Sequence, residues 1–294
     1  MSSDALILSS SDLELELSPS IGGAISRLTY VGEGGPRPIL REGHSPLQNV
    51  LEAASFPLVP FVNRVRAGSF AFRGRTVSLM PNMAGDPSPL HGQGWLNPWT
   101  VEQSDGTSAI LSYSHEPGEW PWAYMARQEF RLDGPVLDLA LTCRNGSSEL
   151  MPCGLGQHPY FPCTPQTRLN SEVGFAWTID EQVLPVAKVP ATGRYDLSDR
   201  LICGQDLDNG FADWSGRVVM NDLAWPYELE LSSPQAPFFQ IFSPVGGGFF
   251  VAEPVTHANA ALNAPEPDWP ELGLRVLEPG EEMRLDMRIE VRAK

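Results

Sequence analysis

Strict alternation of apolar and charged residues is the clearest pattern in the chain, and it is strongest near the C-terminus. In EEMRLDMRIEVRAK, residues 281–294, apolar side chains from Met283 to Val291 occupy every second position. Successive side chains of a strand point to opposite faces, so this pattern predicts a half-buried strand. Pro279-Gly280 supplies a turn before it, and the segment LRVLEPGEE is therefore expected to form a C-terminal hairpin with this strand.

Similar alternating runs recur along the chain, while no segment shows an apolar period of 3.6 over three helical turns. The runs are LELELS at 13–18, GSFAFRGRTVSL with a bend at Gly74, EFRLDGPVLDLALTC with a bend at Asp133-Gly134, YELELSS at 227–233 and FFQIFSP at 238–244. The 27 glycines and 28 prolines are spread throughout and disfavour long helices. The pattern predicts an all-β sandwich or barrel of antiparallel strands.

The length of 294 residues and the even composition predict a single domain over residues 1–294. No repeat, charged tail or low-complexity segment marks a boundary. The glycines at 246–248 lie between two strand-like runs without the lysine of a phosphate loop, and they are expected to form a turn. Large antiparallel sheets have a concave face, where a sugar-sized ligand is expected.

The formal net charge of -16 and the sequence pI of about 4.6 make nucleic acid and anionic membranes poor partners. The segment MSSDALILSSSDLELELS has neither a basic region nor a sustained apolar run, so no signal peptide or membrane span is expected. These features predict a cytoplasmic protein. The cysteines lack the close paired spacing of a metal or disulfide motif, and free thiols are expected at Cys143, Cys153, Cys163 and Cys203.

A histidine and a glutamate stand in similar, conformationally restrained positions. His158 precedes Pro159 in GLGQHPYFP, and Glu253 precedes Pro254 after the apolar run of FFVAEPV. A proline ring disfavours the α region for the residue before it, so both side chains are expected on extended backbone. A carboxyl group after an apolar run is costly unless it is paired or functional. The two residues are therefore candidates for an acid and a base acting on one substrate.

The chain has five histidines, and His91 is the second one in an unusual context. It lies in SPLHGQGW, where Gly92 gives the backbone freedom. The other three, His44, His115 and His257, are expected in surface or supporting positions. His257 lies four residues after Glu253 and is a candidate for orienting it.

Six ordered blocks of this sequence resemble the aldose 1-epimerases, or mutarotases. The blocks are LSPSIGGAISRL, PLVPFVNRVRAGSFAFRGRTVSL, PLHGQGW, GLGQHPYF, DLDNGFADWSG and FFVAEPVTHANAALN. The resemblance implies a large antiparallel β-supersandwich with few short helices, no cofactor and no metal. It also implies that the protein interconverts the α and β anomers of a free sugar.

Carried over block by block, the resemblance implies a role for each polar residue. Glu253 is expected to be the catalytic base and His158 the catalytic acid. Arg64, His91 and Asp208 are expected to position the substrate, with Asn63 supporting Arg64. Opening a sugar ring requires the anomeric hydroxyl to lose a proton and the ring oxygen to gain one, which is why an acid and a base are needed.

Several alternatives remain open from the sequence. Asp208 lies between Asp206 and Asn209 in an expected loop and can instead cap a turn. Arg64 can instead form an ion pair with Glu52 or another acid. Galactose-type mutarotases often have a histidine where Asn209 stands and a glycine where Gln93 stands. Both positions are expected to hold sugar hydroxyls, so we expect an aldose substrate without specifying galactose.

Three other functions are compatible with the same residues. An epimerase of a hexose 6-phosphate or other acidic sugar would use basic groups such as Arg64, Arg66, Arg73 and Arg75, although the last three are expected on an exposed polar face. A non-catalytic carbohydrate-binding protein would need no acid–base pair. A glycosidase would use two carboxyl groups, such as Asp208 and Glu253.

Overall fold

The computed structural model describes residues 5–43 and 46–294, so His44 lies outside the described residues. The chain folds as an all-β protein, as the alternating pattern predicts. The helices within the described residues are single 3-10 turns: η1 (Val50–Glu52), η2 (Arg66–Gly68), η3 (Gly94–Leu96), η4 (Gly193–Tyr195), η5 (Ala261–Asn263) and η6 (Glu266–Asp268).

The larger sheet has nine strands within the described residues, and its neighbouring strands pair antiparallel. In spatial order they are β18 (Arg200–Leu201), β15 (Arg168–Ser171), β20 (Arg217–Asn221), β21 (Tyr227–Ser232), β25 (Glu282–Ala293), β11 (Val136–Asn145), β10 (Tyr124–Asp133), β9 (Ser108–His115) and β8 (Thr100–Ser104). Burial alternates along β10 and β25, so one face of this sheet meets the core and the other meets solvent.

The second sheet has eight strands within the described residues and holds the middle of the molecule. They are β17 (Pro185–Pro190), β16 (Phe175–Ile179), β19 (Leu207–Ala212), β22 (Phe238–Ser243), β23 (Phe249–Val255), β13 (Gly156–Gln157) and β5 (Pro57–Leu58), with β14 (Tyr160–Pro162) also paired to β23. Burial is nearly continuous along β22 and β23. Both faces of this sheet are therefore covered.

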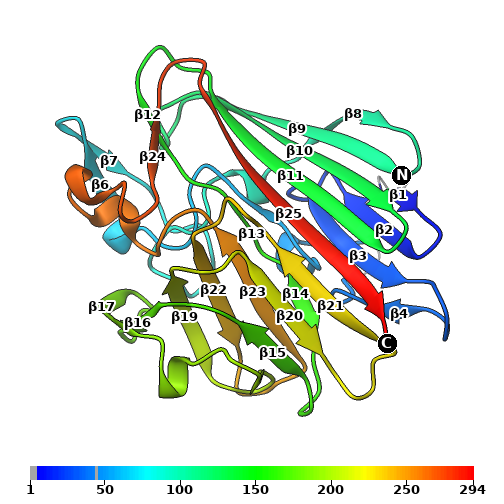
Figure 1. Ribbon diagram of the computed structural model, residues 1–294. Helices are drawn as coiled ribbons and strands as arrows, with labels where there is room; N and C mark the ends of the chain where they lie inside the picture. The colour runs from blue at the N-terminus through cyan, green and yellow to red at the C-terminus, as the bar shows by residue number, and fades with distance from the viewer. Residues whose placement is uncertain (1–4, 44–45) are drawn as a thin grey trace.

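Three smaller sheets complete the described part of the fold. They are β1 (Leu6–Ser9), β2 (Leu13–Ser18), β3 (Ala24–Tyr30) and β4 (Arg37–Pro38); the hairpin of β6 (Ser69–Phe72) and β7 (Arg75–Ser78); and the pair of β12 (Met151–Cys153) and β24 (Arg275–Leu277). Figure 1 shows β19, β22 and β23 side by side, while β8–β11 lie on the other side of β25. The β6–β7 hairpin lies at one edge of the molecule.

Two apolar clusters cover the two faces of the eight-stranded sheet. Phe239 of β22 and Phe250 of β23 belong to the main core, which also receives side chains from the nine-stranded sheet. Their neighbours Phe238 and Val251 belong to a second cluster. Because side chains alternate along a strand, each strand supplies both clusters, which explains the almost unbroken apolar runs.

The predicted strands at 13–18, 227–233, 238–244 and 281–294 are confirmed as β2, β21, β22 and β25. The hairpins bending at Gly74 and at Asp133-Gly134 are confirmed as β6–β7 and β10–β11. The predicted C-terminal hairpin is wrong. Strand β24 pairs with β12, and β25 lies between β11 and β21. Alternation shows which face of a strand is buried, but a partner is chosen by the whole sheet.

The expectation of four free thiols is also wrong. Cys163, just after β14, forms a disulfide with Cys203, and their Cα atoms are 5.7 Å apart. Cys143 and Cys153 are free and buried. The bonded residues are 40 apart in sequence, so no local spacing signals the bond.

A search of the described residues for a helix long and apolar enough to cross a lipid bilayer finds none.

Candidate active site

A cavity of about 190 Å³ lies against the second apolar cluster. It is smaller than the roughly 300–1,000 Å³ of pockets for drug-sized ligands, and so suits a small molecule. The residues around it come from distant parts of the chain: Leu51, Phe56, Asn63, Arg64, Met83, Leu90, His91, Trp95, His158, Tyr160, Asp208, Phe242 and Glu253. All six polar residues singled out in the sequence are among them.

Strand alternation aims the acidic side chains at this cavity. In β23, Phe250 and Ala252 enter the main core, so Glu253 takes the opposite face. In β19, Leu207 enters the core and Asp208 takes the opposite face. Asp208 was expected in a loop, and that prediction is wrong because it lies in a strand paired with β22. The charge in an apolar run is thus explained by the second face of the sheet.

His158 lies between β13 and β14, and its ring is held by aromatic neighbours. The ring of Phe56 stacks on it at 4.5 Å between centroids, and the His158 backbone N–H donates to the Phe56 carbonyl. Nε2 of His158 lies 3.4 Å from Oε1 of Glu253. The structure therefore brings together two side chains that are 95 residues apart in sequence. The sequence showed no signal for Phe56.

Burial controls the protonation of this pair. It lowers the pKa of His158 to about 3 and raises the pKa of Glu253 well above its usual value, with Asp208 adding to the upward shift. Both shifts favour the uncharged form of the group, so burial favours a proton shared by the pair on the carboxyl group rather than on the imidazole. The expected charges, a carboxylate and an imidazolium, are the less favoured placement of the same proton. Moving it to Nε2 leaves the net charge unchanged.

Two further polar atoms of the pair lack a partner. Within the described part of the chain, Nδ1 of His158 and Oε2 of Glu253 are buried and make no hydrogen bond. A buried polar atom without a partner raises the free energy of the folded state. Their position in a cavity wall makes both groups candidates for contact with a bound molecule.

His91 is held as a neutral hydrogen-bond donor. Its Nδ1 accepts from the backbone N–H of Asn63 at 3.1 Å, which leaves the ring proton on Nε2. Burial, with smaller contributions from His158 and Arg64, holds its pKa well below the usual value. A Cβ at Gly92 would lie 2.1 Å from the Val59 carbonyl oxygen, so the turn that carries His91 requires glycine. Asn63 was expected to support Arg64, whereas its backbone N–H and carbonyl both bond His91.

Arg64 and Asp208 are each held by a residue that the sequence analysis did not identify. Nε of Arg64 donates to Asp86 at 2.8 Å. Arg64 therefore forms the ion pair that the sequence left open, with Asp86 as the acid, and it also lines the cavity. Nε2 of Gln240 donates to Asp208 at 2.8 Å. Burial raises the pKa of Asp208, while Arg64 and the Gln240 hydrogen bond act against this shift. Gln240 is a polar residue in the middle of a largely apolar strand, a signal that was available in the sequence.

His257 supports the cavity from behind rather than orienting Glu253. Its Nε2 accepts from the backbone N–H of Val62 at 2.9 Å, and its Nδ1 faces the Ala258 carbonyl at 2.8 Å. A Cβ at Gly154 would lie 1.9 Å from the His257 ring, which explains the first glycine of GLGQHPYF. Burial lowers the pKa of His257 to about 4, so the ring is neutral and fixes the segment that carries Asn63 and Arg64.

Tyr160 is another cavity residue that the sequence analysis left unassigned. Its ring centroid lies 4.7 Å from that of His158, and the guanidinium of Arg41 lies over the ring, 3.6 Å from its centroid. Arg41 also donates to the carbonyls of Leu51 and Ala53. Burial raises the pKa of Tyr160 to about 12, against the effect of Arg41, so the phenol stays a hydrogen-bond donor at neutral pH.

Gln93 and Asn209 lie outside the set of residues that line the cavity. The side chain of Asn209 donates to the Trp177 carbonyl at 2.8 Å, and Gln93 accepts from the Tyr124 hydroxyl at 3.4 Å. These contacts contradict the expectation that both positions hold sugar hydroxyls. Asn209 follows Asp208 in β19, so alternation turns it to the other face.

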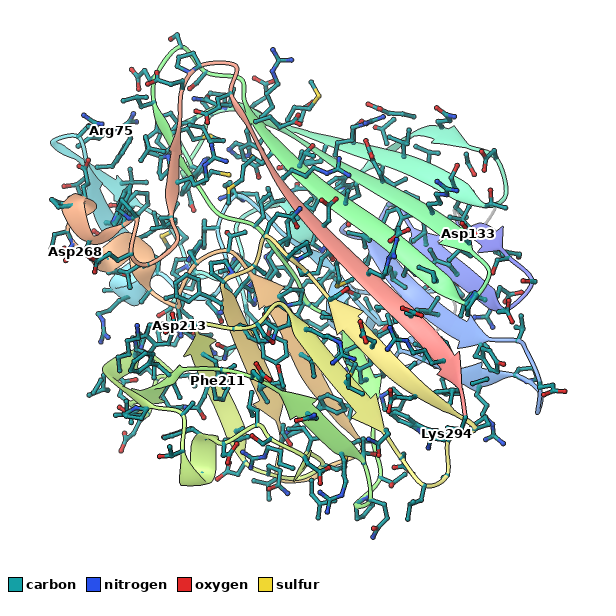
Figure 2. All side chains as sticks on the ribbon, viewed as in Figure 1. Arg75, Asp133, Phe211, Asp213, Asp268 and Lys294 are labelled. Atoms are coloured by element: carbon teal, nitrogen blue, oxygen red, sulfur yellow. A yellow bond between two sulfur atoms is a disulfide. The ribbon has the colours of Figure 1, made fainter. Side chains whose placement is uncertain are left out.

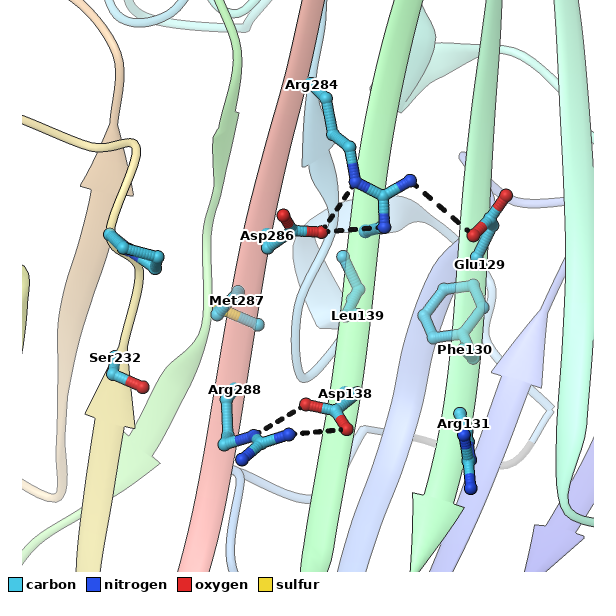
Figure 3. A pocket seen from close by; sticks show the side chains of 12 residues that line it. Glu129, Phe130, Arg131, Asp138, Leu139, Ser232, Arg284, Asp286, Met287 and Arg288 are labelled. Atoms are coloured by element: carbon cyan, nitrogen blue, oxygen red, sulfur yellow. Dashed lines mark hydrogen bonds and ion pairs between the residues drawn. The ribbon is translucent and has the colours of Figure 1, made fainter.

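A wider groove of about 540 Å³ crosses the solvent face of the nine-stranded sheet (Figure 3). Its charged side chains already pair with one another: Arg288 with Asp138 at 2.7 Å and Arg284 with Asp286 at 2.8 Å. Their side chains are 37–53% exposed, which is typical of ion pairs on a solvated sheet face. We therefore place the candidate site in the smaller cavity. Across residues 5–43 and 46–294, no group of three or more His, Cys, Asp or Glu is arranged to hold a metal ion.

Comparison with known proteins agrees with this fold. The match with a solved galactose mutarotase-like protein from Clostridium acetobutylicum covers 99% of the present chain and 95% of that chain. Its TM-score is 0.85 at 18% identity, so the two proteins share a fold. A solved candidate aldose 1-epimerase from Escherichia coli K12 matches with a TM-score of 0.88 and 31% identity, over 99% of both chains. The fold is therefore that of the galactose mutarotase-like proteins.

Sequence comparison gives the family. The family model for aldose 1-epimerase matches residues 13–290. YphB of Escherichia coli (strain K12), an uncharacterised protein, is 33% identical over 265 residues, which are 86% of this chain and 89% of YphB. The chain belongs to the aldose 1-epimerase family, and this places it among the mutarotase-like sugar epimerases.

Proposed function

We propose that this protein interconverts the α and β anomers of a free aldose by acid–base opening of the ring, rotation about C1–C2 and reclosure. The observation that carries the proposal is the 3.4 Å separation of His158 Nε2 and Glu253 Oε1 in a small cavity. The anomeric hydroxyl and the ring oxygen are bonded to the same carbon. An acid and a base that serve these two oxygens must therefore lie side by side.

In this mechanism Glu253, as carboxylate, takes the proton of the anomeric hydroxyl while protonated His158 gives one to the ring oxygen. The C1–O5 bond breaks, and the free aldehyde rotates about C1–C2. Reclosure on the other face reverses both proton transfers and restores the pair. One proton shared by the pair is sufficient for the whole cycle, because each group acts once as acid and once as base.

The remaining polar groups are suited to hold the sugar beyond C1. Neutral His91 and the guanidinium of Arg64 offer N–H donors, and the carboxyl group of Asp208 accepts. Asn63 acts through its hydrogen bonds to His91. In this proposal residues 1–294 work as one unit, since the cavity gathers side chains from Leu51 to Glu253.

The acidic-sugar alternative receives little support from the basic residues considered for it. Arg66 and Arg73 lie at the surface and face Asp180 and Glu266 at 3.5 Å. Arg75 is on the β6–β7 hairpin at the edge of the molecule (Figure 2). Arg64, the basic residue of this set that lines the cavity, is paired with Asp86 and faces two further carboxyl groups. A neutral aldose suits this charge balance better than a phosphate ester.

Polarimetry of freshly dissolved α-glucose, α-galactose and several pentoses tests the proposal. We expect the protein to accelerate relaxation to the anomeric equilibrium for at least one aldose. Unchanged relaxation with every sugar would falsify it. Tight sugar binding without acceleration would instead favour a binding protein. Release of reducing sugar from a disaccharide would favour a glycosidase. Acceleration only with glucose 6-phosphate would favour the acidic-sugar alternative.

Asp86→Asn tests how Arg64 is held. The amide keeps the shape of the side chain but removes the charge that anchors Nε of Arg64. A hydrogen bond to a charged group contributes about 1.5–3 kcal/mol, so we expect KM for the sugar to rise about tenfold or more with kcat little changed. Steady-state polarimetry separates the two constants. Asp105→Asn, in an exposed turn, is the matched control and should leave KM and kcat unchanged. An unchanged KM in Asp86→Asn would contradict the role of Asp86 in holding Arg64.

A further inference from the structure

The Cys163–Cys203 disulfide lies at the end of the eight-stranded sheet where the catalytic and substrate-binding strands meet. Cys163 follows His158 by five residues, and Cys203 precedes Asp208 by five. At the same end, β22 turns into β23, the strand of Glu253. One covalent bond thus joins the segment of the proposed acid to the segment of a proposed substrate-binding carboxyl group.

The bond spans strands that are not neighbours. In the sheet, β19 is followed by β22 and then β23, and β14 pairs with the far side of β23. Strands lie about 4.8 Å apart, so β19 and β14 are separated by roughly 14 Å. The Cα atoms of the two cysteines are only 5.7 Å apart. The segment from Cys203 to Asp206 must therefore fold across the β22–β23 turn to reach Cys163.

Contacts at the turn show that it is built around the bond. The predicted turn is present but begins earlier than the three glycines: its turn residues are 245 and 246, and the Gly247 N–H donates to the Pro244 carbonyl. The Gly248 N–H donates to Sγ of Cys203 at 3.3 Å, and the Gly248 carbonyl accepts from the Cys163 N–H at 3.0 Å. A Cβ at Gly247 would lie 3.2 Å from the same sulfur. The glycine turn thus leaves room for the bridge and hydrogen-bonds both of its ends.

The start of β19 depends on such an anchor. Strand β22 pairs with β19 from Leu207 to Ala212, whereas β16 pairs only with Phe211 and Ala212. The first residues of β19, including Asp208, therefore have a partner strand on one side only. The segment before them is held by the disulfide and by the Gln205 N–H, which donates to Oγ of Ser243 at 3.0 Å.

We propose that the Cys163–Cys203 bond is a reversible clasp that positions Asp208 for sugar binding, and that its reduction by a dithiol loosens this strand and weakens sugar affinity. In the exchange, the two thiols of the reductant are oxidised to a disulfide. Cys163 and Cys203 receive the two electrons and two protons as thiols. Both residues are partly exposed, so a small thiol can reach the bond, whereas Cys143 and Cys153 are buried. The part of the proposal that concerns sugar affinity rests on the proposed function.

Three measurements on the whole chain test the clasp: native-state thiol alkylation read by mass spectrometry, amide hydrogen exchange and polarimetry. Protein treated with oxidised or reduced dithiothreitol is compared. We expect no alkylation after oxidation and two labelled cysteines, Cys163 and Cys203, after reduction. Hydrogen exchange in residues 203–210 should quicken about tenfold on reduction, because the strand end loses its anchor. KM should rise about three- to tenfold, the equivalent of one hydrogen bond to the sugar, with kcat within about twofold.

Cys163→Ser/Cys203→Ser is the matched variant. It should behave as the reduced protein in exchange and KM, and the reductant should not alter it further. Two alkylated cysteines in the oxidised protein would overturn the proposal, as would equal exchange and equal KM before and after reduction. If no aldose is turned over, the proposed function fails by itself. Alkylation and hydrogen exchange still decide whether the clasp exists and holds β19, because neither needs a substrate.

Discussion

Glu253→Gln is expected to slow the proposed interconversion of anomers by about 10²–10⁴-fold, the usual contribution of one positioned acid–base group. The amide has the shape of the carboxyl group but can neither take the proton of the anomeric hydroxyl nor share a proton with His158 Nε2 at 3.4 Å. His158→Gln should lose activity by a similar factor. The double variant should be little worse than either single variant, because the two groups act as a unit.

Matched controls separate catalysis from folding. Glu271→Gln changes an exposed glutamate in a surface loop, and His115→Gln changes a half-buried histidine outside the cavity lining. Both should retain the rate of the unmodified protein. Sugar affinity of Glu253→Gln, measured by calorimetry, should stay within about tenfold, because the positioning groups remain. A rate for Glu253→Gln within threefold of the unmodified protein would remove this residue from the proposed mechanism.

Acid should destabilise the fold before it titrates the catalytic pair. Burial depresses the pKa values of His91, His158 and His257, the last two to about 3 and about 4, whereas an unfolded histidine has a pKa of about 6.5. As the pH falls below that value, the unfolded chain gains protons at these three sites and the folded chain does not. Each site lowers the free energy of unfolding by about 1.4 kcal/mol per pH unit over this window.

Glu253 and Asp208 act in the opposite direction. Their pKa values are raised in the fold, so the folded chain holds a proton that unfolded carboxyl groups release above a pKa of about 4. The two carboxyl groups therefore offset part of the loss caused by the three histidines. A net loss of stability remains expected between pH 6.5 and pH 5, because the histidines outnumber the carboxyl groups.

Urea unfolding at pH 6.5 and pH 5.0 measures this loss. We expect a lower midpoint at pH 5.0, and a smaller difference in His257→Gln, which has one buried histidine fewer. Equal free energies of unfolding at both pH values would contradict the buried neutral histidines.

Gln240 and Asp86 illustrate how far sequence patterns reach into the site. Gln240 interrupts an apolar strand, and period-two alternation already places it on a defined face. Asp86 lies in a loop rich in turn residues, where an aspartate usually caps a turn; its Oδ1 does so with the Ser88 N–H, while Oδ2 holds Arg64. The capping role of Asp86 has a local signal in the sequence, whereas its contact with Arg64 has none.

The sequence by itself determined the strand pattern and the turn glycines, and its resemblance to the aldose 1-epimerases pointed to the six polar residues that line the cavity. The strand pattern and the turns depend on alternation and on proline and glycine, whose effects are confined to neighbouring residues. Only the tertiary structure decided that β24 pairs with β12, that Cys163 meets Cys203, and that His158 lies beside Glu253. It also set the directions in which burial shifts the pKa values of that pair. Partner strands and pKa values follow from burial among residues distant in sequence, which no local pattern encodes.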